Sequence, residues 1–275
     1  VGYRCTVLIL LSPAKSLDFE SPLATRKHTE PRLLDESERL IEVMRDKPAS
    51  ELAGLMHISD ELAALNAQRY LDFDPPFTTR NARAAILAFA GDVYQGLAVR
   101  QLWDARDFTE AQKTVRILSG LYGVLRPLDL MQPYRLEMGL PVATDRGSNL
   151  YQFWGDRITR LLQADLNEAP GTKALINLAS DEYARSVHFA DFENPVIAPR
   201  FEDTNAAGAR QVVSFFAKRA RGAMAGWLVR ERVRTPRALK KFAEGGYRYD
   251  PATSTTQQPV FVRRYQDRPA MPSGR

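Results

Sequence analysis

The first part of the chain contains a continuous apolar run from Val7 to Leu11, in which no polar residue alternates with the apolar ones. Such a run is typical of a β-strand that is covered on both faces of a sheet. The run ends at Ser12-Pro13, a dipeptide that favours a loop. The sequence therefore predicts one buried strand near the start of the chain, followed directly by a loop.

The segment from Pro31 to about Phe89 has apolar residues at helical spacing. Ser59-Asp60 is a helix start signal, and Asp74-Pro75-Pro76 interrupts the pattern, which resumes from Thr79. The pattern predicts several short helices joined by tight turns. The apolar positions that carry it are Leu33, Leu34, Leu40, Ile41, Met44, Leu52, Leu55, Met56, Leu62, Ala63 and Leu65.

Thr109-Glu110-Ala111-Gln112 has the form of a capping box, in which side chains satisfy the free amide groups at the start of a helix. We therefore expect a helix to begin there, with Ala111, Val115 and Leu118 on its buried face. The glycines at positions 120 and 123 are expected to end it.

The second half of the chain is expected to be richer in strands. The predicted elements are a helix from Leu150 to Asn167, buried strands at Ala174 to Leu178 and Val196 to Phe201, a hairpin strand at Gln211 to Phe216, and a hairpin that pairs Tyr247 to Tyr249 with Val260 to Val262. The chain has no internal repeat and no linker-like segment. These features predict a single compact α/β domain of mixed type over residues 1–268, with a disordered tail over residues 269–275.

Cysteine and histidine content limits the chemistry that the chain can carry. Cys5 is the one cysteine, so an intrachain disulfide and a cysteine-based zinc site are excluded, and His28, His57 and His188 form no ligand motif. We predict no metal and no cofactor. No apolar stretch approaches the ~20 residues that cross a bilayer, and the short apolar core near Cys5 lacks a cleavage signal, so we expect a cytoplasmic protein without a membrane partner.

Charge adds information about partners. The formal net charge is +5, but the segment from Arg210 to Lys241 alone has ten basic residues and one acidic residue, a local balance of +9 that leaves −4 for the rest. The sequence thus predicts a slightly acidic body with one strongly basic segment. A field of that kind attracts polyanions.

Two segments could bind a phosphate group. A strand ending near Phe216 is expected to lead into a helix with Lys218, Arg219 and Arg221 on its first turn, where cations oppose the helix dipole and a bound anion would compensate them. Lys15 lies in the loop Ser12 to Ser16 that leaves the first strand, although this loop lacks the P-loop pattern. The alternative for both segments is that these cations are simply solvated.

The glycines Gly120 and Gly123 lie between stretches that we expect to be helical. They resemble the hairpin of a helix-hairpin-helix element, whose backbone amides bind a DNA phosphate. The alternative is a helix cap followed by a tight packing turn. A second candidate for the element is the segment from Leu55 to Leu62, which has helix-turn-helix spacing but no glycine.

A polar cluster is expected where strands of the second half end. Asn177, Ser180, Asp181, Glu182 and Lys218 could form an acid/base or magnesium site there. The simpler interpretation is that Ser180 or Asp181 caps a helix that opens at Glu182. No Ser-His-Asp or Cys-His arrangement is present in a recognisable motif.

Several motifs together resemble the bacterial YaaA family of peroxide-stress proteins, over about Val7 to Tyr265. They are Ser12-Pro-Ala-Lys15, Leu118-Ser-Gly-Leu-Tyr-Gly-Val-Leu-Arg-Pro-Leu-Asp129, Pro133-Tyr-Arg-Leu-Glu-Met138, Phe153-Trp154, Asn177-Leu-Ala-Ser-Asp-Glu-Tyr183 and Phe216-Ala-Lys-Arg-Ala-Arg-Gly222. The resemblance implies protection against hydrogen peroxide, a link to low intracellular free iron, and an α/β fold with a positively charged cleft and a helix-hairpin-helix element that binds DNA. Carried onto this chain, it implies a cleft lined by Lys218, Arg219 and Arg221, with Lys15, Arg126 and Arg135.

These observations predict a DNA-binding protein that recognises the backbone of double-stranded or structured DNA, without catalytic residues and without an obligate protein partner. The alternative is a metal-dependent enzyme for a nucleotide or phosphorylated substrate, with Lys15, Asp181, Glu182 and Lys218 around a metal-bound phosphate. Direct iron sequestration is the weakest candidate, because the chain has no His-rich or E-x-x-H pattern.

Overall fold

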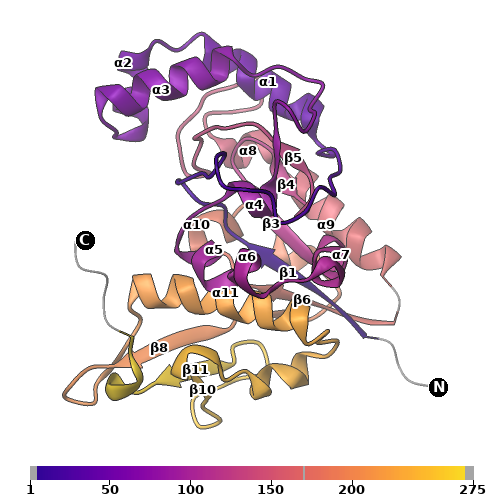
Figure 1. The fold of residues 1–275 in the computed structure, drawn as a ribbon, viewed down its shortest axis with the longest axis vertical. Helices are drawn as coiled ribbons and strands as arrows, with labels where there is room; N and C mark the ends of the chain where they lie inside the picture. Colours follow the sequence, from indigo (N-terminus) through magenta and orange to yellow (C-terminus); the bar gives the residue numbers. More distant parts are fainter. Residues whose placement is uncertain (1–4, 170, 270–275) are drawn as a thin grey trace.

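The computed structural model describes residues 5–169 and 171–269, and the strand predicted at Val7 to Leu11 forms the middle of its central sheet (Figure 1). The strand order is β4 (Gly123–Leu125), β3 (Val115–Ser119), β1 (Cys5–Leu11), β6 (Thr172–Asn177) and β7 (Val196–Ile197). β1 pairs in parallel with both β3 and β6, β7 continues the parallel set, and β4 is antiparallel to β3. Residues 7–11 are at most 2% exposed, which confirms a strand covered on both faces.

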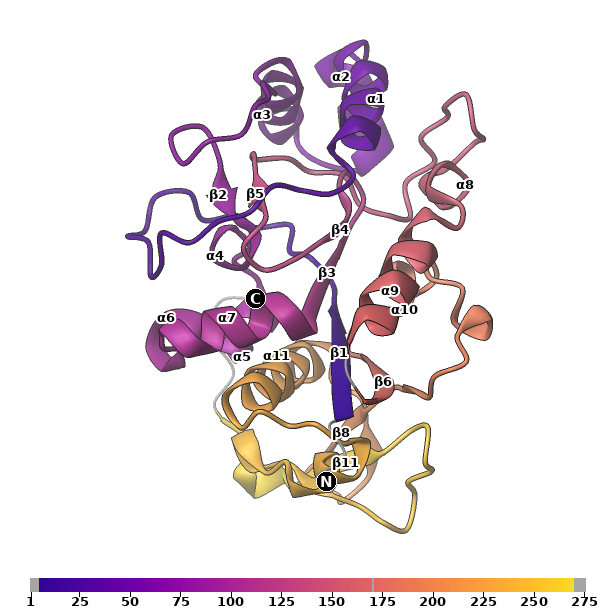
Figure 2. The same ribbon diagram turned by 90° about the vertical axis from the view of Figure 1, so that its right-hand side faces the viewer.

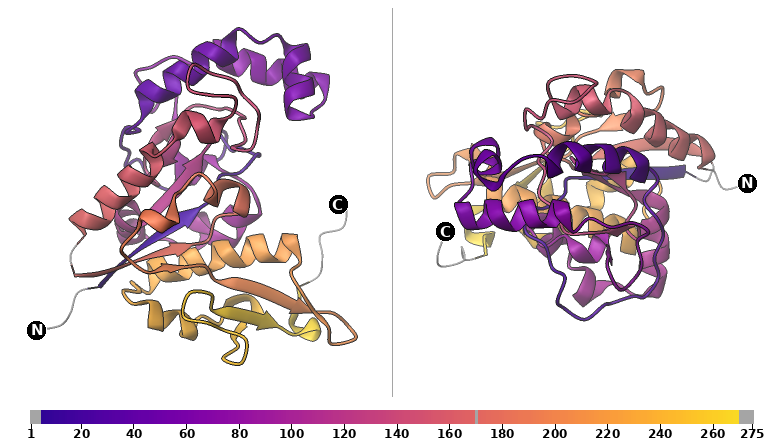
Figure 3. Two further views of the ribbon diagram at one scale, coloured as in Figure 1. Left: turned by 180° about the vertical axis from the view of Figure 1, so that it is seen from behind. Right: turned by 90° about the horizontal axis from the view of Figure 1, so that it is seen from above.

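Helices cover both faces of this sheet. Figure 2 shows α7 and α11 on one side of β1 and α9 on the other. The α-helices of the described residues are α1 (Leu34–Arg45), α2 (Ala49–Met56), α3 (Asp60–Leu71), α4 (Ala85–Ala88), α5 (Asp92–Leu97), α6 (Val99–Leu102), α7 (Ala105–Thr114), α8 (Leu150–Trp154), α9 (Arg157–Glu168), α10 (Asp181–Ala184) and α11 (Ser214–Arg230). The first three form a lobe at one end of the molecule (Figures 1 and 3), as the helical spacing of that segment predicts.

A second sheet lies beyond α11, at the end opposite the α1–α3 lobe (Figures 1 and 2). Its order is β10 (Arg248–Tyr249), β11 (Val260–Arg263), β8 (Arg200–Thr204) and β9 (Arg210–Gln211). β8 pairs with β9 and β10 pairs with β11, both antiparallel, so both predicted hairpins are confirmed. In the first hairpin, β9 is much shorter than the strand predicted up to Phe216. A small sheet of β2 (Arg83–Ala84) and β5 (Leu130–Met131), together with short 3-10 helices (Phe189–Asp191, Pro236–Lys241, Glu244–Gly246 and Tyr265–Asp267), completes the fold.

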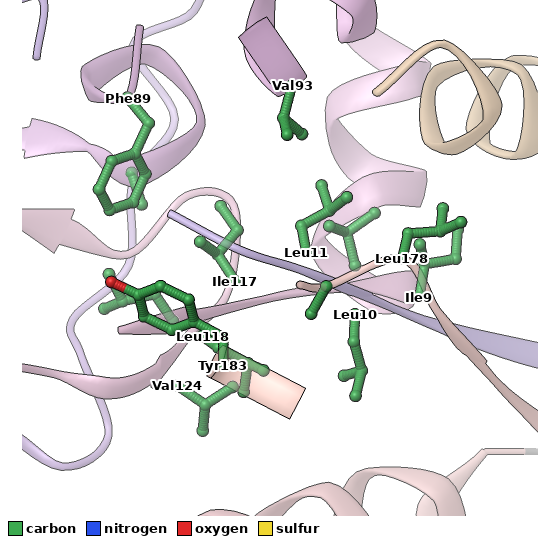
Figure 4. Close-up of a cluster of buried hydrophobic side chains, with 14 of the residues drawn as sticks. Ile9, Leu10, Leu11, Phe89, Val93, Ile117, Leu118, Val124, Leu178 and Tyr183 are labelled. Carbon is green, nitrogen blue, oxygen red and sulfur yellow. The ribbon is translucent and has the colours of Figure 1, made fainter. Parts of the chain in front are cut away.

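The core is built mainly from the two faces of the central sheet. Figure 4 shows side chains of β1, β3 and β4 packed together with Phe89, Val93, Leu178 and Tyr183. All of the labelled side chains are at least nine-tenths buried. The same packing brings Val93 and Leu178, which come from different parts of the chain, next to the end of β1, where the candidate site lies.

The helix that was expected to begin at Thr109 begins four residues earlier, at Ala105, so its predicted position is wrong. Asp104 is the residue that caps α7, because its carboxylate accepts hydrogen bonds from the amides of Arg106 and Asp107, at 2.7 and 2.9 Å. The helix therefore starts at Ala105 and ends at Thr114. Residues 115–119, predicted as helical, form β3, since this stretch is buried on both sides next to β1.

Other boundaries also differ from the expectation. The helix predicted from Leu150 to Asn167 is broken at Gly155, which has φ of +51° and separates α8 from α9. The strand predicted from Val196 to Phe201 is interrupted at Pro199 and belongs to two different sheets. The strand predicted up to Phe216 ends at Gln211, and the segment resuming at Thr79 forms β2 and α4 rather than one helix.

The mixed α/β class of a single domain is confirmed by these sheets and helices. Among the described residues, no helix has both the length and the apolar character that a membrane span requires. Of the predicted tail, residues 270–275 lie outside the described residues.

Candidate functional site

A pocket of about 350 Å³ opens where β1 and β6 end. These two strands are adjacent and parallel, with Leu10 opposite Asn177, so the residues that follow them leave the same edge of the sheet. In the sheet, β1 has β3 on one side and β6 on the other, so the strand order reverses at β1. Ligands of open α/β sheets bind at such a reversal, beyond the carboxyl ends of the strands. The lining residues are Ser12, Pro13, Ala14, Lys15, Ser16, Ala90, Gly91, Asp92, Val93, Tyr134, Arg135, Leu136, Glu137, Leu178, Ser180, Glu182, Tyr183, Lys218 and Arg221.

The floor of the pocket is fixed by hydrogen bonds between the two strand ends. The amide of Ser180 donates to Ser12 Oγ at 2.8 Å, and this hydroxyl donates to Ser180 Oγ at 3.2 Å. The hydroxyl of Tyr94 donates to the carbonyl of Ser12 at 3.0 Å. A helix, α10, does start directly after Ser180, as predicted. The predicted cap is not formed by Ser180, because its side chain bonds Ser12 and accepts no hydrogen bond from the helix.

One wall of the pocket is an ionic group centred on Glu137. Its Oε1 lies 3.0 Å from Lys15 Nζ and 3.0 Å from Arg135 Nη2. The residue is 8% exposed, and its second oxygen, Oε2, is buried and has no hydrogen-bond partner within residues 5–169 and 171–269. A buried carboxylate oxygen without a donor is rare, because desolvation then goes uncompensated.

Another part of the lining comes from α11, which supplies Lys218 and Arg221. This helix packs backbone to backbone against α5, since a Cβ at Gly222 would lie 1.8 Å from the carbonyl oxygen of Val93, and one at Gly96 would lie 2.0 Å from that of Arg219. Because α11 starts at Ser214, the lysine is its fifth residue, so the predicted placement of the cations on the first turn is wrong. What holds them at the pocket is the close crossing of the two helices.

The basic segment from Arg210 to Lys241 is neutralised only in part in the folded chain. Four of its arginines form ion pairs, namely Arg210 with Asp250, Arg230 with Glu244, Arg232 with Asp107 and Arg234 with Glu110.

Lys218 and Arg221 differ from these paired residues. Neither forms an ion pair or a side-chain hydrogen bond with another described residue, although the negative charge of Asp181 acts on Arg221. Burial lowers the pKa of Arg221, and the charge of Asp181 opposes this shift. An anion in the pocket would supply the charge that both side chains lack.

The lining as a whole is mixed in charge. Lys15, Arg135, Lys218 and Arg221 are balanced by the carboxylates Glu137, Glu182 and Asp92. The arrangement therefore suits a ligand that combines an anionic group with hydrogen-bond donors.

Comparison with known proteins identifies the family. The family model described as peroxide stress protein YaaA matches residues 7–253. The chain belongs to the YaaA family of peroxide stress proteins. A UPF0246 protein of Tolumonas auensis (strain DSM 9187 / NBRC 110442 / TA 4) is 52% identical over 257 residues, and one of Cellvibrio japonicus (strain Ueda107) is 48% identical over 257 residues. Each alignment covers 94% of this chain and 98% of the relative.

The cations that the YaaA resemblance assigns to a cleft do not all meet. Lys15, Arg135, Lys218 and Arg221 line the pocket. Arg219 lies over the ring of Phe215 at 5.5 Å instead. Arg126 follows β4, where it pairs with the fully buried Asp129 at 2.9 Å and donates to the carbonyl of Glu30 at 3.0 Å, and it is absent from the lining.

Of the two glycines of the YaaA-like motif, Gly120 directly follows strand β3 and Gly123 is the first residue of strand β4, so the helices predicted on either side of them are wrong. Gly120 packs against Leu136, whose carbonyl oxygen would lie 2.1 Å from an added Cβ, and its own carbonyl accepts a hydrogen bond from Trp154 Nε1 at 2.9 Å. Gly123 has φ of +65° and packs on the Trp154 ring. Tight packing inside a β-hairpin accounts for both glycines.

The second helix-turn-helix candidate has two helices where the sequence predicts them. α2 ends at Met56, His57 adopts φ of +51°, and α3 starts at Asp60 with the hydroxyl of Ser59 accepting from the amide of Leu62 at 3.4 Å. Leu62 and Leu65 of α3 are 41% and 46% exposed. The pair is a helix hairpin in the outer lobe, separate from the residues that line the pocket.

The predicted acid/base cluster is only partly assembled. Glu182 lines the pocket, but its Oε1 accepts from the amide of Gly139 at 3.0 Å, and the Asn177 side chain accepts from the amide of Ala179 at 3.0 Å. Within the described part of the chain, no three His, Cys, Asp or Glu side chains are placed to hold a metal ion.

Sequence analysis missed two aromatic residues of the site, Tyr134 and Tyr183. Both line the pocket and are 5% and 8% exposed, and burial raises the pKa of each hydroxyl above its usual range. Burial keeps Tyr134 neutral, and a hydrogen bond of 2.6 Å with Ser119 Oγ holds its hydroxyl in place. Their position inside two of the family motifs was the available signal.

Proposed function

We propose that this YaaA-family protein acts in the response to peroxide by binding DNA through its phosphate groups, with little dependence on base sequence. The observation that carries the proposal is the pair of cations without an ionic partner among the described residues, Lys218 and Arg221, at the end of β1 and β6. Cations that are already ion-paired gain little from a phosphate, because the phosphate must displace a carboxylate. Unpaired cations in a partly desolvated pocket gain more.

A second contact is proposed for the outer lobe. The turn between α2 and α3 carries the free amide groups at the start of α3, near Ser59, and helix starts favour phosphate oxygens. Contacts at both the pocket and this turn would hold one DNA molecule at two points along its backbone. In this proposal the packed glycines Gly120 and Gly123 support the pocket wall rather than touching DNA.

The proposal is tested by removing the unpaired charges. The double variant Lys218→Gln/Arg221→Gln is expected to bind a duplex more weakly. It should also lower the slope of log affinity against log salt by about 0.9 for each phosphate that is no longer neutralised, roughly 1.8 in all. Fluorescence anisotropy titrations at several salt concentrations measure both quantities. Circular dichroism checks that the variant remains folded.

The matched control removes two charges that are ion-paired. Arg200→Gln/Arg210→Gln changes the net charge by the same amount, but these side chains lie 2.6 Å from Glu202 and 2.5 Å from Asp250, respectively. We expect a slope close to that of the wild type. Equal reductions in the two double variants would show that only the overall charge matters and would reject the pocket as the phosphate site.

An enzyme that acts on a nucleotide is the second candidate, because the pocket is small and contains Lys15, Glu182 and Lys218 of the predicted catalytic set. Asp181 is not among its lining residues, and metal-dependent chemistry lacks a ligand cluster within the described residues. Incubation of nucleotides with magnesium or manganese, with and without Glu182→Gln, tests this candidate. Turnover by the wild type that the variant loses would favour it.

The link to low free iron belongs to the proposal as an indirect effect. The described residues offer no group of three or more His, Cys, Asp or Glu side chains that could sequester iron. A protein bound to DNA would instead limit damage where iron and peroxide react. Iron binding by the purified protein, measured by equilibrium dialysis, would contradict the indirect route.

A further inference from the structure

We infer that the pocket holds a single guanine nucleotide, with its base recognised by Glu137 and Lys15 and its phosphate bound by Lys218 and Arg221. The nucleotide could come from DNA, in which case the inference rests on the proposed function, or it could be a free mononucleotide. Both sources present the same chemistry to the pocket. The starting point is a carboxylate oxygen in the lining that no other described residue satisfies.

Glu137 Oε2 is buried without a donor among the described residues, whereas Oε1 already receives Lys15 and Arg135, both at 3.0 Å. A carboxylate oxygen has two lone pairs and can only accept hydrogen bonds. The ligand group that meets Oε2 must therefore be a donor, and two adjacent donors would satisfy it best. A phosphate or any other anion at this wall would be repelled.

Guanine is the nucleobase with two adjacent donors, the ring N1–H and the exocyclic N2 amino group. Thymine places carbonyl oxygens on both sides of its single N–H, and these would face the carboxylate. Next to N1–H, guanine also carries the acceptor O6, which suits the ammonium group of Lys15. The Lys15 side chain is 64% exposed, so it can turn toward a ligand without breaking the packed core.

The rest of the pocket fits the rest of a nucleotide. The rings of Tyr134 and Tyr183 supply buried aromatic surface, and the unpaired Lys218 and Arg221 supply positive charge on another wall. The volume of about 350 Å³ is in the range of small-molecule sites and far below that of a duplex. A guanine from DNA must therefore leave the base stack to enter, which costs least when it is already unpaired.

The test compares duplexes that differ at one position. A fully paired duplex is titrated beside duplexes that contain one extra unpaired G, A, C or T, and free dGMP and dTMP are used as competitors. We expect the wild type to bind the unpaired-G duplex roughly tenfold more tightly than the paired duplex, and dGMP to compete better than dTMP. Glu137→Gln should remove this preference, so that the variant binds the unpaired-G duplex and the paired duplex with equal affinity.

The matched control is Glu36→Gln, because Glu36 is likewise a carboxylate paired with two cations, Arg146 at 2.6 Å and Arg157 at 3.1 Å, but does not line the pocket. This variant should keep the preference for unpaired G. If Glu137→Gln does not fold, the competition by dGMP and dTMP on the wild type decides alone. Equal competition by the two would overturn the inference.

The outcomes separate the inference from the proposed function. Equal affinity for paired and unpaired-G duplexes, without dGMP competition, overturns the guanine site and leaves duplex binding intact. Binding of dGMP in a protein that binds no DNA supports the guanine site and rejects the proposed function. A preference for unpaired A, C or T overturns the recognition by Glu137 and Lys15.

Discussion

Gly222 is the position where a single methyl group should separate the helix that carries Lys218 and Arg221 from the rest of the molecule. A Cβ at this position would lie 1.8 Å from the carbonyl oxygen of Val93 and 2.9 Å from the amide of Leu97. Both are backbone atoms of α5, so no rotamer change relieves the contact. In Gly222→Ala, α11 must therefore move away from α5 along their crossing.

The size of the effect follows from what must move. Overpacking in a well-packed core costs typically about 1–3 kcal/mol, and a clash with backbone atoms belongs at the upper end, so we expect Gly222→Ala to lose about 3 kcal/mol of unfolding free energy. Gly54→Ala is the matched control. Gly54 lies within α2, and an added Cβ there would meet nothing within 4 Å. Alanine should stabilise that helix by about 0.5–1 kcal/mol.

Urea unfolding followed by circular dichroism gives both free energies, with the m-value as a check that the transition keeps its cooperativity. The two substitutions are chemically identical, so the opposite signs report only the surroundings. If Gly222→Ala stayed within about 0.5 kcal/mol of the wild type, the backbone contact between α5 and α11 would not be what positions the basic wall.

Two further predictions concern buried and partly buried charges. Asp165 bridges Arg32 at 2.6 Å and Arg116 at 2.5 Å. Asp165→Asn should therefore lower the free energy of unfolding in urea by about 3–5 kcal/mol, because it leaves a buried guanidinium unpaired. Asp267→Asn is the control and should change this free energy little, because its partner Arg264 is well exposed. For Asp18, desolvation alone would raise the pKa, but hydrogen bonds from Ser21 and Glu20 and the charge of Arg100 lower it from 3.8 to about 2. Its stabilisation is complete above the unfolded pKa and is lost as the pH falls through about 2, so Asp18→Asn should cost about 2 kcal/mol at pH 7 and roughly half as much at pH 3. If the difference in unfolding free energy between the wild type and Asp18→Asn grew as the pH was lowered, the predicted pH dependence would be wrong.

The sequence predicted correctly those elements in which the apolar positions of the segment are also the positions that are buried in the fold. Residues 7–11 are apolar at every position and form a strand covered on both faces, and the spacing of Leu40, Ile41 and Met44 corresponds to the buried face of α1. Ser59 caps α3 as its sequence suggests. In each case one local signal and the tertiary environment favour the same conformation.

The errors occur where tertiary pairing decides between two locally acceptable conformations. Residues 115–119 follow a helix without a break, and pairing with the neighbouring strands β1 and β4 makes them a strand. For Gly120 and Gly123 the sequence allows either a DNA-binding hairpin or a tight packing turn, and in the fold a second segment, around Leu136, covers Gly120. No pattern within 118–127 reveals that segment, because its own sequence lies outside this stretch.

The ion pairs of the basic segment also could not be predicted, because they depend on tertiary structure. The sequence reveals ten basic residues between Arg210 and Lys241, but not that Asp107, Glu110, Glu244 and Asp250 neutralise four of them. Within the described residues, folding pairs these four with carboxylates and leaves the other six basic residues without an ion pair. Those six carry more information about a ligand than the total does, since a paired cation has already found its anion.

The unpaired groups of the pocket are of both signs, and this restricts the ligand more than either sign alone. Among the described residues, Lys218 and Arg221 form no ion pair or side-chain hydrogen bond, and Glu137 Oε2 lacks a donor. The buried Glu137 oxygen is the group whose lack of a partner costs stability, because Lys218 is exposed to solvent and the charge of Asp181 acts on Arg221, so a partner that meets Glu137 as well as the cations is favoured. A phosphate alone would leave the carboxylate unsatisfied, and a base alone would leave the cations unpaired. A nucleotide carries both groups at a fixed separation, and DNA-backbone binding and guanine recognition can therefore be two contacts of one ligand.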